Sequence, residues 1–84
     1  MKKVPKKLFD EFLHKCRKYW IENENIYSET YLLAKELEGL TGVQWLAWKD
    51  LTNAFLYPNG LDRAVTNEQI YEILKIVGWE VVDE

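Results

Sequence analysis

The side chains that most often perform covalent chemistry are scarce in this chain. It has 84 residues, with one histidine, His14, and one cysteine, Cys16. At about 100° per helical residue the two lie roughly 160° apart, so they cannot form a nucleophile–base pair. No second histidine or cysteine is present to complete a zinc site, and no glycine-rich phosphate loop or nucleophile elbow occurs. We therefore expect no enzymatic activity, no metal and no cofactor.

Paired carboxylates are the other candidate for chemistry. Glu68 and Glu72 lie one turn apart in a segment with helical periodicity. General acid–base catalysis by such a pair requires a cleft and a raised pKa. Both residues fall on the polar side of an amphipathic helix, which predicts a solvated acidic face that could contact a basic partner.

Charge is divided by position. Residues 1–20 carry seven basic side chains against two acidic ones, a net charge of +5. Residues 21–84 carry four basic side chains against twelve acidic ones, a net charge of −8. A basic first helix thus precedes an acidic body, and the two could bind different partners or pair with each other.

The bulk composition limits the class of protein. Hydrophobic residues make up 48% of the chain and aromatic residues 14%, which is enough for one folded domain over residues 1–84. A single cysteine cannot form an internal disulfide. No apolar stretch approaches the roughly 18–20 residues that cross a membrane. We expect a cytoplasmic protein with no membrane contact.

The elements that hold these residues are predicted to be mainly α-helical. Apolar periodicity and end signals place four helices at about 5–20, 29–38, 42–56 and 67–77, and a short strand or extended segment at about 79–82. Thr41 and Thr66 begin apparent capping boxes, and Ser28 a simpler cap. Gly39 ends the second helix. No convincing second strand is evident.

The third predicted helix is apolar on nearly all sides and ends before Pro58, where residues 57–60 have the order of a type I turn. Such a helix is usually central in its bundle. One interpretation makes all of its apolar residues core. The other places Trp45 and Leu56 on an exposed patch. The predicted partner-binding residues are Trp20, Trp45, Lys49 and Leu56.

A second hypothesis is nucleic-acid binding. The predicted helices 29–38 and 42–56, joined through a glycine-containing turn, loosely resemble a helix-turn-helix. The residues that would contact DNA are Lys6, Lys7, Gln44, Lys49 and Asn53. Only one positive charge would lie on the recognition helix, however, and acidic residues precede it, which weakens phosphate contact.

These features favour a small non-catalytic interaction or regulatory module that binds a larger protein partner. Small phage or mobile-element inhibitors and adaptors have a similar size and composition. The alternative is a small DNA-binding transcription regulator, which predicts salt-dependent DNA binding. A third option is a homodimer, in which the C-terminal strands or the tryptophan surfaces of two chains pair.

Overall fold

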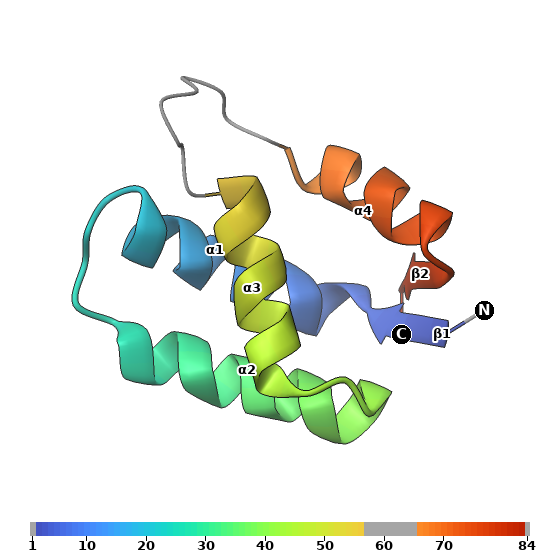
Figure 1. The fold of residues 1–84 in the computed structure, drawn as a ribbon, viewed down its shortest axis with the longest axis horizontal. Coiled ribbons are helices and arrows are strands. Elements are labelled where there is room, and N and C mark those ends of the chain that lie inside the picture. Colours follow the sequence, from blue (N-terminus) through green and yellow to red (C-terminus); the bar gives the residue numbers. More distant parts are fainter. Residues whose placement is uncertain (1, 57–65, 84) are drawn as a thin grey trace.

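Four helices and a two-stranded sheet make up the part of the chain that the computed structural model describes, residues 2–56 and 66–83. The order along the chain is β1 (Lys2–Pro5), α1 (Lys6–Trp20), α2 (Tyr27–Thr41), α3 (Trp45–Leu56), α4 (Asn67–Ile76) and β2 (Trp79–Val82) (Figure 1). The predicted mainly α class, with a short C-terminal strand, is confirmed. The turn predicted at 57–60 lies outside the described residues.

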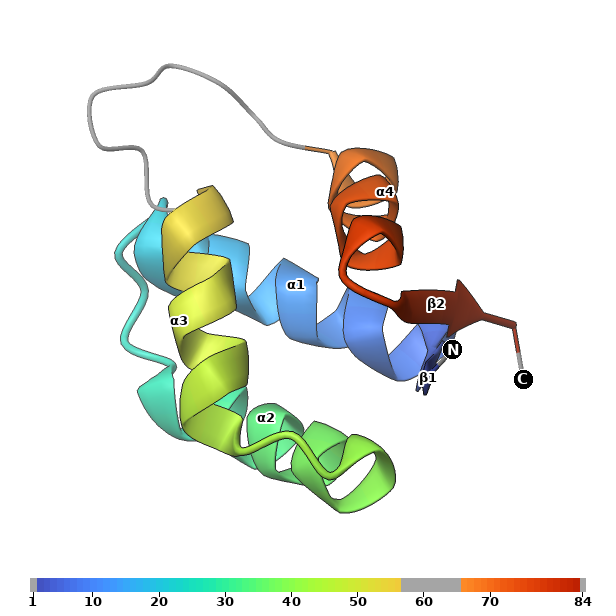
Figure 2. The same ribbon diagram turned by 45° about the vertical axis from the view of Figure 1, so that its right-hand side comes forward.

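The partner of β2 is β1, which the sequence did not predict. The two strands are parallel, with Val4 opposite Val81 in register, and they lie side by side in both ribbon views (Figures 1 and 2). The backbone N–H of Lys2 donates to the carbonyl of Gly78 at 3.1 Å. Val4 is fully buried, so this short strand is held by one core side chain together with the backbone ladder.

The core is formed by one face of each helix together with Val4 of β1. The buried residues of α1 are spaced as expected for one side of a helix, in agreement with the apolar periodicity that predicted it. The buried apolar residues of the described chain are Val4, Phe9, Phe12, Leu13, Cys16, Ala34, Leu37, Trp48, Leu56, Ile70 and Leu74.

The ends of α2 differ from the prediction. The helix begins at Tyr27, before Ser28, and runs through Gly39 to Thr41. Thr41 does not start α3 with a capping box, because its Oγ1 donates back to the carbonyl of Leu37 at 2.7 Å and so stays part of α2. Gly42, with φ of +79°, ends α2 in the left-handed conformation that glycine adopts without strain.

The capping box predicted for α4 is confirmed. The Thr66 hydroxyl accepts from the backbone N–H of Gln69 at 3.2 Å, and the Gln69 side chain accepts from the N–H of Thr66 at 2.8 Å. The helix then runs from Asn67 to Ile76, one residue shorter than predicted. Gly78 follows with φ of +94° and turns the chain into β2.

A polar cluster on Asp10 fastens α4 to α1. Its carboxylate accepts from Lys6 Nζ at 3.0 Å and from Asn67 Nδ2 at 3.1 Å, and also from the Tyr71 hydroxyl. Burial, together with the Asp10 carboxylate, raises the pKa of Tyr71. The tyrosine therefore stays protonated and keeps donating throughout the neutral range.

Among the helices of residues 2–56 and 66–83, none is both long enough and apolar enough to cross a membrane.

Candidate interaction site

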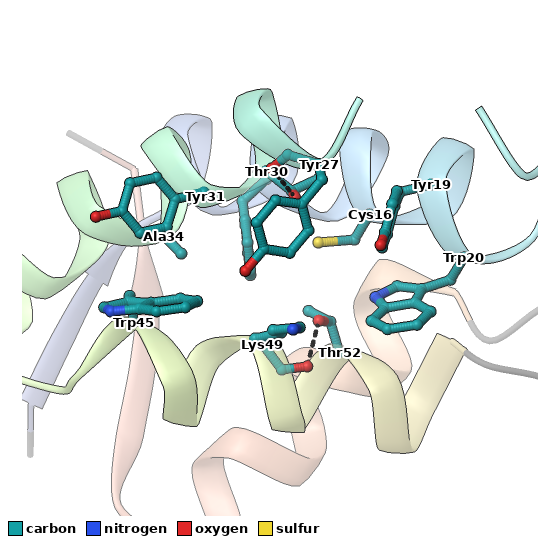
Figure 3. A pocket seen from close by; sticks show the side chains of 11 residues that line it. Cys16, Tyr19, Trp20, Tyr27, Thr30, Tyr31, Ala34, Trp45, Lys49 and Thr52 are labelled. Atoms are coloured by element: carbon teal, nitrogen blue, oxygen red, sulfur yellow. Dashed lines mark hydrogen bonds between the residues drawn. The ribbon is translucent and has the colours of Figure 1, made fainter. Parts of the chain in front are cut away.

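A crevice lined mainly by aromatic side chains lies where α1, α2 and α3 meet (Figure 3). We call it the aromatic crevice and define it by five residues that are all at least partly exposed: Tyr19, Trp20, Tyr27, Tyr31 and Trp45. The other residues that line it are Phe12, Cys16, Thr30, Ala34, Lys49 and Thr52.

Each helix contributes side chains from one face. The last turn of α1 supplies Tyr19 and Trp20, and the first turns of α2 supply Tyr27 and Tyr31, four residues apart on one side of the helix. The rings pack edge to face. Tyr31 and Trp45 have ring centroids 4.8 Å apart, Tyr19 and Trp20 are 4.9 Å apart, and Tyr19 and Tyr27 are 5.7 Å apart. The T-shaped contacts suit the ring quadrupoles and connect the three helices.

Lys49 lies in the middle of the crevice, between Trp45 at one end and Trp20 at the other (Figure 3). Its ammonium nitrogen is 4.9 Å from the centre of the Tyr27 ring, which is a cation–π distance. The side chain is half-buried. Within the described residues no carboxylate forms an ion pair with it, and none of the crevice-lining residues is acidic.

The buried residues at the bottom of the crevice, Cys16 and Thr52, are unreactive at neutral pH. Burial raises the pKa of the Cys16 thiol to about 12, so the reactive thiolate is not formed at neutral pH. Thr52, also buried, donates its hydroxyl to the backbone carbonyl of Lys49 at 2.8 Å. The cavity volume is about 10 Å³, room for about one water molecule. The site is therefore suited to contact across its mouth and not to enclosing a metabolite.

A shallower depression of about 200 Å³ adjoins the crevice at the end of α1. It is lined by Tyr19, Trp20, Asn23 and Glu24. Asn23 has φ of +56°, a left-handed conformation that asparagine tolerates better than most residues. Glu24 faces Lys18, with 3.5 Å between the carboxylate oxygen and the ammonium nitrogen. The crevice and this depression thus form one surface region with two charges of opposite sign.

The structure brings three of the four predicted partner-binding residues together. Trp20, Trp45 and Lys49 all line the crevice. The prediction for Leu56 was wrong, because this residue is 4% exposed and belongs to the core. The buried face of α3 includes Trp48, Thr52 and Leu56, which repeat every four residues.

Three tyrosines of the crevice were not predicted as site residues. Tyr27 and Tyr31 repeat at the i, i+4 spacing, and this pairing is the signal in the sequence that could have placed both rings on one side of a helix.

The residues predicted for DNA contact do not form one basic face. Lys6 is paired with Asp10, and Lys49 points into the crevice. Lys7, Gln44 and Asn53 are exposed. The exposed side of α3 carries Leu46, Ala47, Asp50, Asn53 and Ala54, with no basic side chain. Phosphate binding needs such cations, so this geometry argues against α3 as a DNA-reading helix.

The basic first helix and the acidic body meet in the fold. Lys15 of α1 pairs with Glu29 of α2 at 3.0 Å, and Lys18 pairs with Glu24 at 3.5 Å. Exposed pairs of this kind contribute only about 0–1 kcal/mol each to stability. They nevertheless use part of the N-terminal charge inside the molecule, and this weakens the case for a separate basic binding surface.

The remaining candidates for chemistry are dispersed. His14, Glu68 and Glu72 are exposed, and in the described part of the chain no three histidine, cysteine or acidic side chains are close enough to hold a metal ion. Comparison with protein-family models, with curated proteins and with solved structures gives no match to this chain.

Proposed function

We propose that the protein is a non-catalytic interaction module and that the aromatic crevice is the surface that binds its protein partner. The observation that carries the proposal is the gathering of five tyrosine and tryptophan side chains from three helices at one half-exposed site. Tryptophan and tyrosine are the residues most enriched at binding hot spots.

The arrangement of these rings suits binding to another protein. A helix that needed them only for packing could bury them, as α1 buries Phe9 and Phe12. In the crevice the rings instead keep an exposed edge, and Tyr27 remains 36% exposed. Aromatic rings fixed in this way lose little conformational entropy on binding and offer a large apolar area to a partner.

Site-specific photo-crosslinking tests the proposal. A benzophenone amino acid replaces Tyr27, which keeps an aromatic ring at the crevice mouth, and the full chain is irradiated in extract from its source cells. A matched control carries the same probe at Glu72, on the exposed side of α4. We expect a discrete covalent adduct from position 27 and none from position 72.

The specificity of that adduct is checked with a second change. Trp45→Ala in the chain labelled at position 27 should reduce the adduct at least fivefold, while circular dichroism shows that the helices are retained. An adduct with twice the mass of the chain would identify the partner as a second copy. Equal labelling from both positions, or no adduct from position 27, would refute the proposed interaction surface.

A further inference from the structure

We infer that the segment bound in the aromatic crevice presents an aspartate or glutamate side chain, whose carboxylate pairs with Lys49. The inference rests on the proposed function, because it gives the chemistry of the partner at the same surface.

Lys49 is held differently from the lysines that pair within the fold. Four lysines of the described chain lie within ion-pair distance of a carboxylate: Lys6, Lys15, Lys18 and Lys35. Lys49 has the Tyr27 ring instead, 4.9 Å from its ammonium nitrogen. The side chain is half-buried among the residues that line the crevice. The ammonium group therefore keeps hydrogen-bond donors that no described carboxylate uses.

The surroundings of Lys49 also favour an anion. None of the lining residues is acidic, although residues 21–84 carry a net charge of −8. The hydroxyl groups of Tyr19, Tyr27 and Tyr31 form no hydrogen bond within the described chain, so they can donate to a bound oxygen. An ammonium group can pair with a carboxylate, and a phenol among the lining residues can donate a further hydrogen bond to it.

The neighbouring depression offers the opposite charge but a weaker case. Glu24 could receive a cation, yet Lys18 already faces it at 3.5 Å. A cation from the partner would have to displace this lysine, whereas a carboxylate at Lys49 displaces no ion pair. The site that lacks its counter-ion is the one at Lys49.

The geometry also indicates how the acidic segment would bind. A cavity of about 10 Å³ cannot enclose a side chain, so the carboxylate meets Lys49 at the mouth. Apolar residues beside it would lie across the rings of Trp45 and Trp20, at the two ends of the crevice (Figure 3). Covering these rings removes water from the ion pair and strengthens it.

Blocked tripeptides provide the test. Acetyl-Leu-Glu-Leu-amide and its uncharged isostere acetyl-Leu-Gln-Leu-amide are titrated into the ¹⁵N-labelled full chain, and the indole N–H resonances of Trp20 and Trp45 are followed by NMR. We expect both resonances to shift with the glutamate peptide at a Kd in the millimolar range. The glutamine peptide should bind at least fivefold more weakly.

Two lysine variants test whether Lys49 causes the preference for the glutamate peptide. Lys49→Met keeps the stem but removes the charge, and it should abolish the preference for glutamate. Lys75→Met removes an exposed lysine of α4 and should leave the preference unchanged. Acetyl-Leu-Leu with a free terminal carboxylate serves as a third peptide, and stronger binding of this peptide than of the glutamate peptide would overturn the side-chain assignment.

Two results would overturn the inference as a whole: equal affinity for the glutamate and glutamine peptides, or no shift of the crevice resonances with either. These outcomes are separable from failure of the proposed function. If photo-crosslinking at position 27 still yields an adduct that depends on Trp45, the crevice is an interaction surface whose partner is not acidic there. If the adduct is also absent, both proposals fail.

Discussion

The molecule contains two aromatic clusters. Both include residues of the same two helices, but they differ in how far other elements of the fold cover them. One, which we call the core cluster, consists of Phe9, Trp48, Tyr71 and Trp79, with ring centroids 5.7 to 6.1 Å apart. The other is the aromatic crevice, with centroids 4.8 to 5.7 Å apart. Helices α1 and α3 contribute to both.

The difference lies in what closes each cluster. The core cluster is covered by α4 and β2, and its one tyrosine donates to Asp10. The crevice has three tyrosine hydroxyls without a hydrogen-bond partner in the described chain, and its cation has only an aromatic face. Similar rings are therefore covered by further elements in one place and partly exposed in the other, and the hydrogen bonding of the tyrosine hydroxyl groups separates the two cases.

The largest expected difference in stability is between alanine variants of the two tryptophans of α3. Trp48→Ala should lower the free energy of unfolding by about 3–5 kcal/mol, because it empties a buried site. Trp45→Ala should cost less than about 1.5 kcal/mol, since the ring is half-exposed. Urea denaturation followed by circular dichroism measures both.

If Trp48→Ala fails to fold, Trp48→Phe keeps the comparison measurable. The indole Nε1 of Trp48 has no hydrogen-bond partner in the described chain, so phenylalanine loses volume but no hydrogen bond. Equal losses of stability for changes at positions 45 and 48 would erase the distinction between the two clusters.

A smaller difference in stability is expected between variants of the polar residues beside each cluster. Asp10→Ala should cost about 1–3 kcal/mol, because it removes the shared acceptor of Lys6, Asn67 and Tyr71. Lys49→Met should cost no more than about 1 kcal/mol, the usual size of a partly exposed cation–π contact. Glu11→Ala, at an exposed neighbour of Asp10, serves as the control. A cost for Lys49→Met above that of Asp10→Ala would show that the crevice serves stability first.

The smallest effect is a pH dependence at the crevice floor. Burial raises the pKa of Cys16 from 9.0 to about 12, so the unfolded chain loses this proton at a lower pH than the folded one. The stability contributed by the neutral thiol is complete below pH 9 and is lost as the pH rises toward 12. Between pH 8 and pH 10 we expect a loss of about 1 kcal/mol.

Chemical denaturation of the wild-type chain and of Cys16→Ala at pH 8, 9 and 10 measures this slope. The variant should lose less stability with rising pH, and any contribution from Tyr71 should appear equally in both chains. Identical slopes would show that the thiol is not buried as described.

The helices could be predicted where a local signal was strong. The Thr66–Gln69 capping box fixed the start of α4, and the spacing of apolar residues fixed the buried face of α1. The same reasoning failed at Thr41, because a threonine can bond back to its own helix as readily as it caps the next one. The local sequence was therefore compatible with either role for Thr41.

The face of α3 and the strand β1 could not be predicted, for different reasons. Apolar residues surround α3, so its amphipathic pattern gives no clear direction, and the buried Thr52 looks polar in sequence. Strand β1 has one apolar side chain, Val4, and ends in a proline. Its pairing depends on β2, far along the chain, and not on any local preference. The crevice was found only in part, since it joins three helices whose contacts no single segment encodes.

The pairing of β1 with β2 has a consequence for the timing of folding during synthesis. The paired positions, such as Lys2 and Trp79, are 77 residues apart. On the ribosome, β1 is made before its partner, which emerges only after all four helices between the two strands. The three helices around the crevice can associate before then, whereas Val4 cannot be covered by the sheet until translation reaches β2. Ribosome-bound chains in which α3 has left the exit tunnel but β2 has not should therefore contain a formed crevice and an unpaired β1.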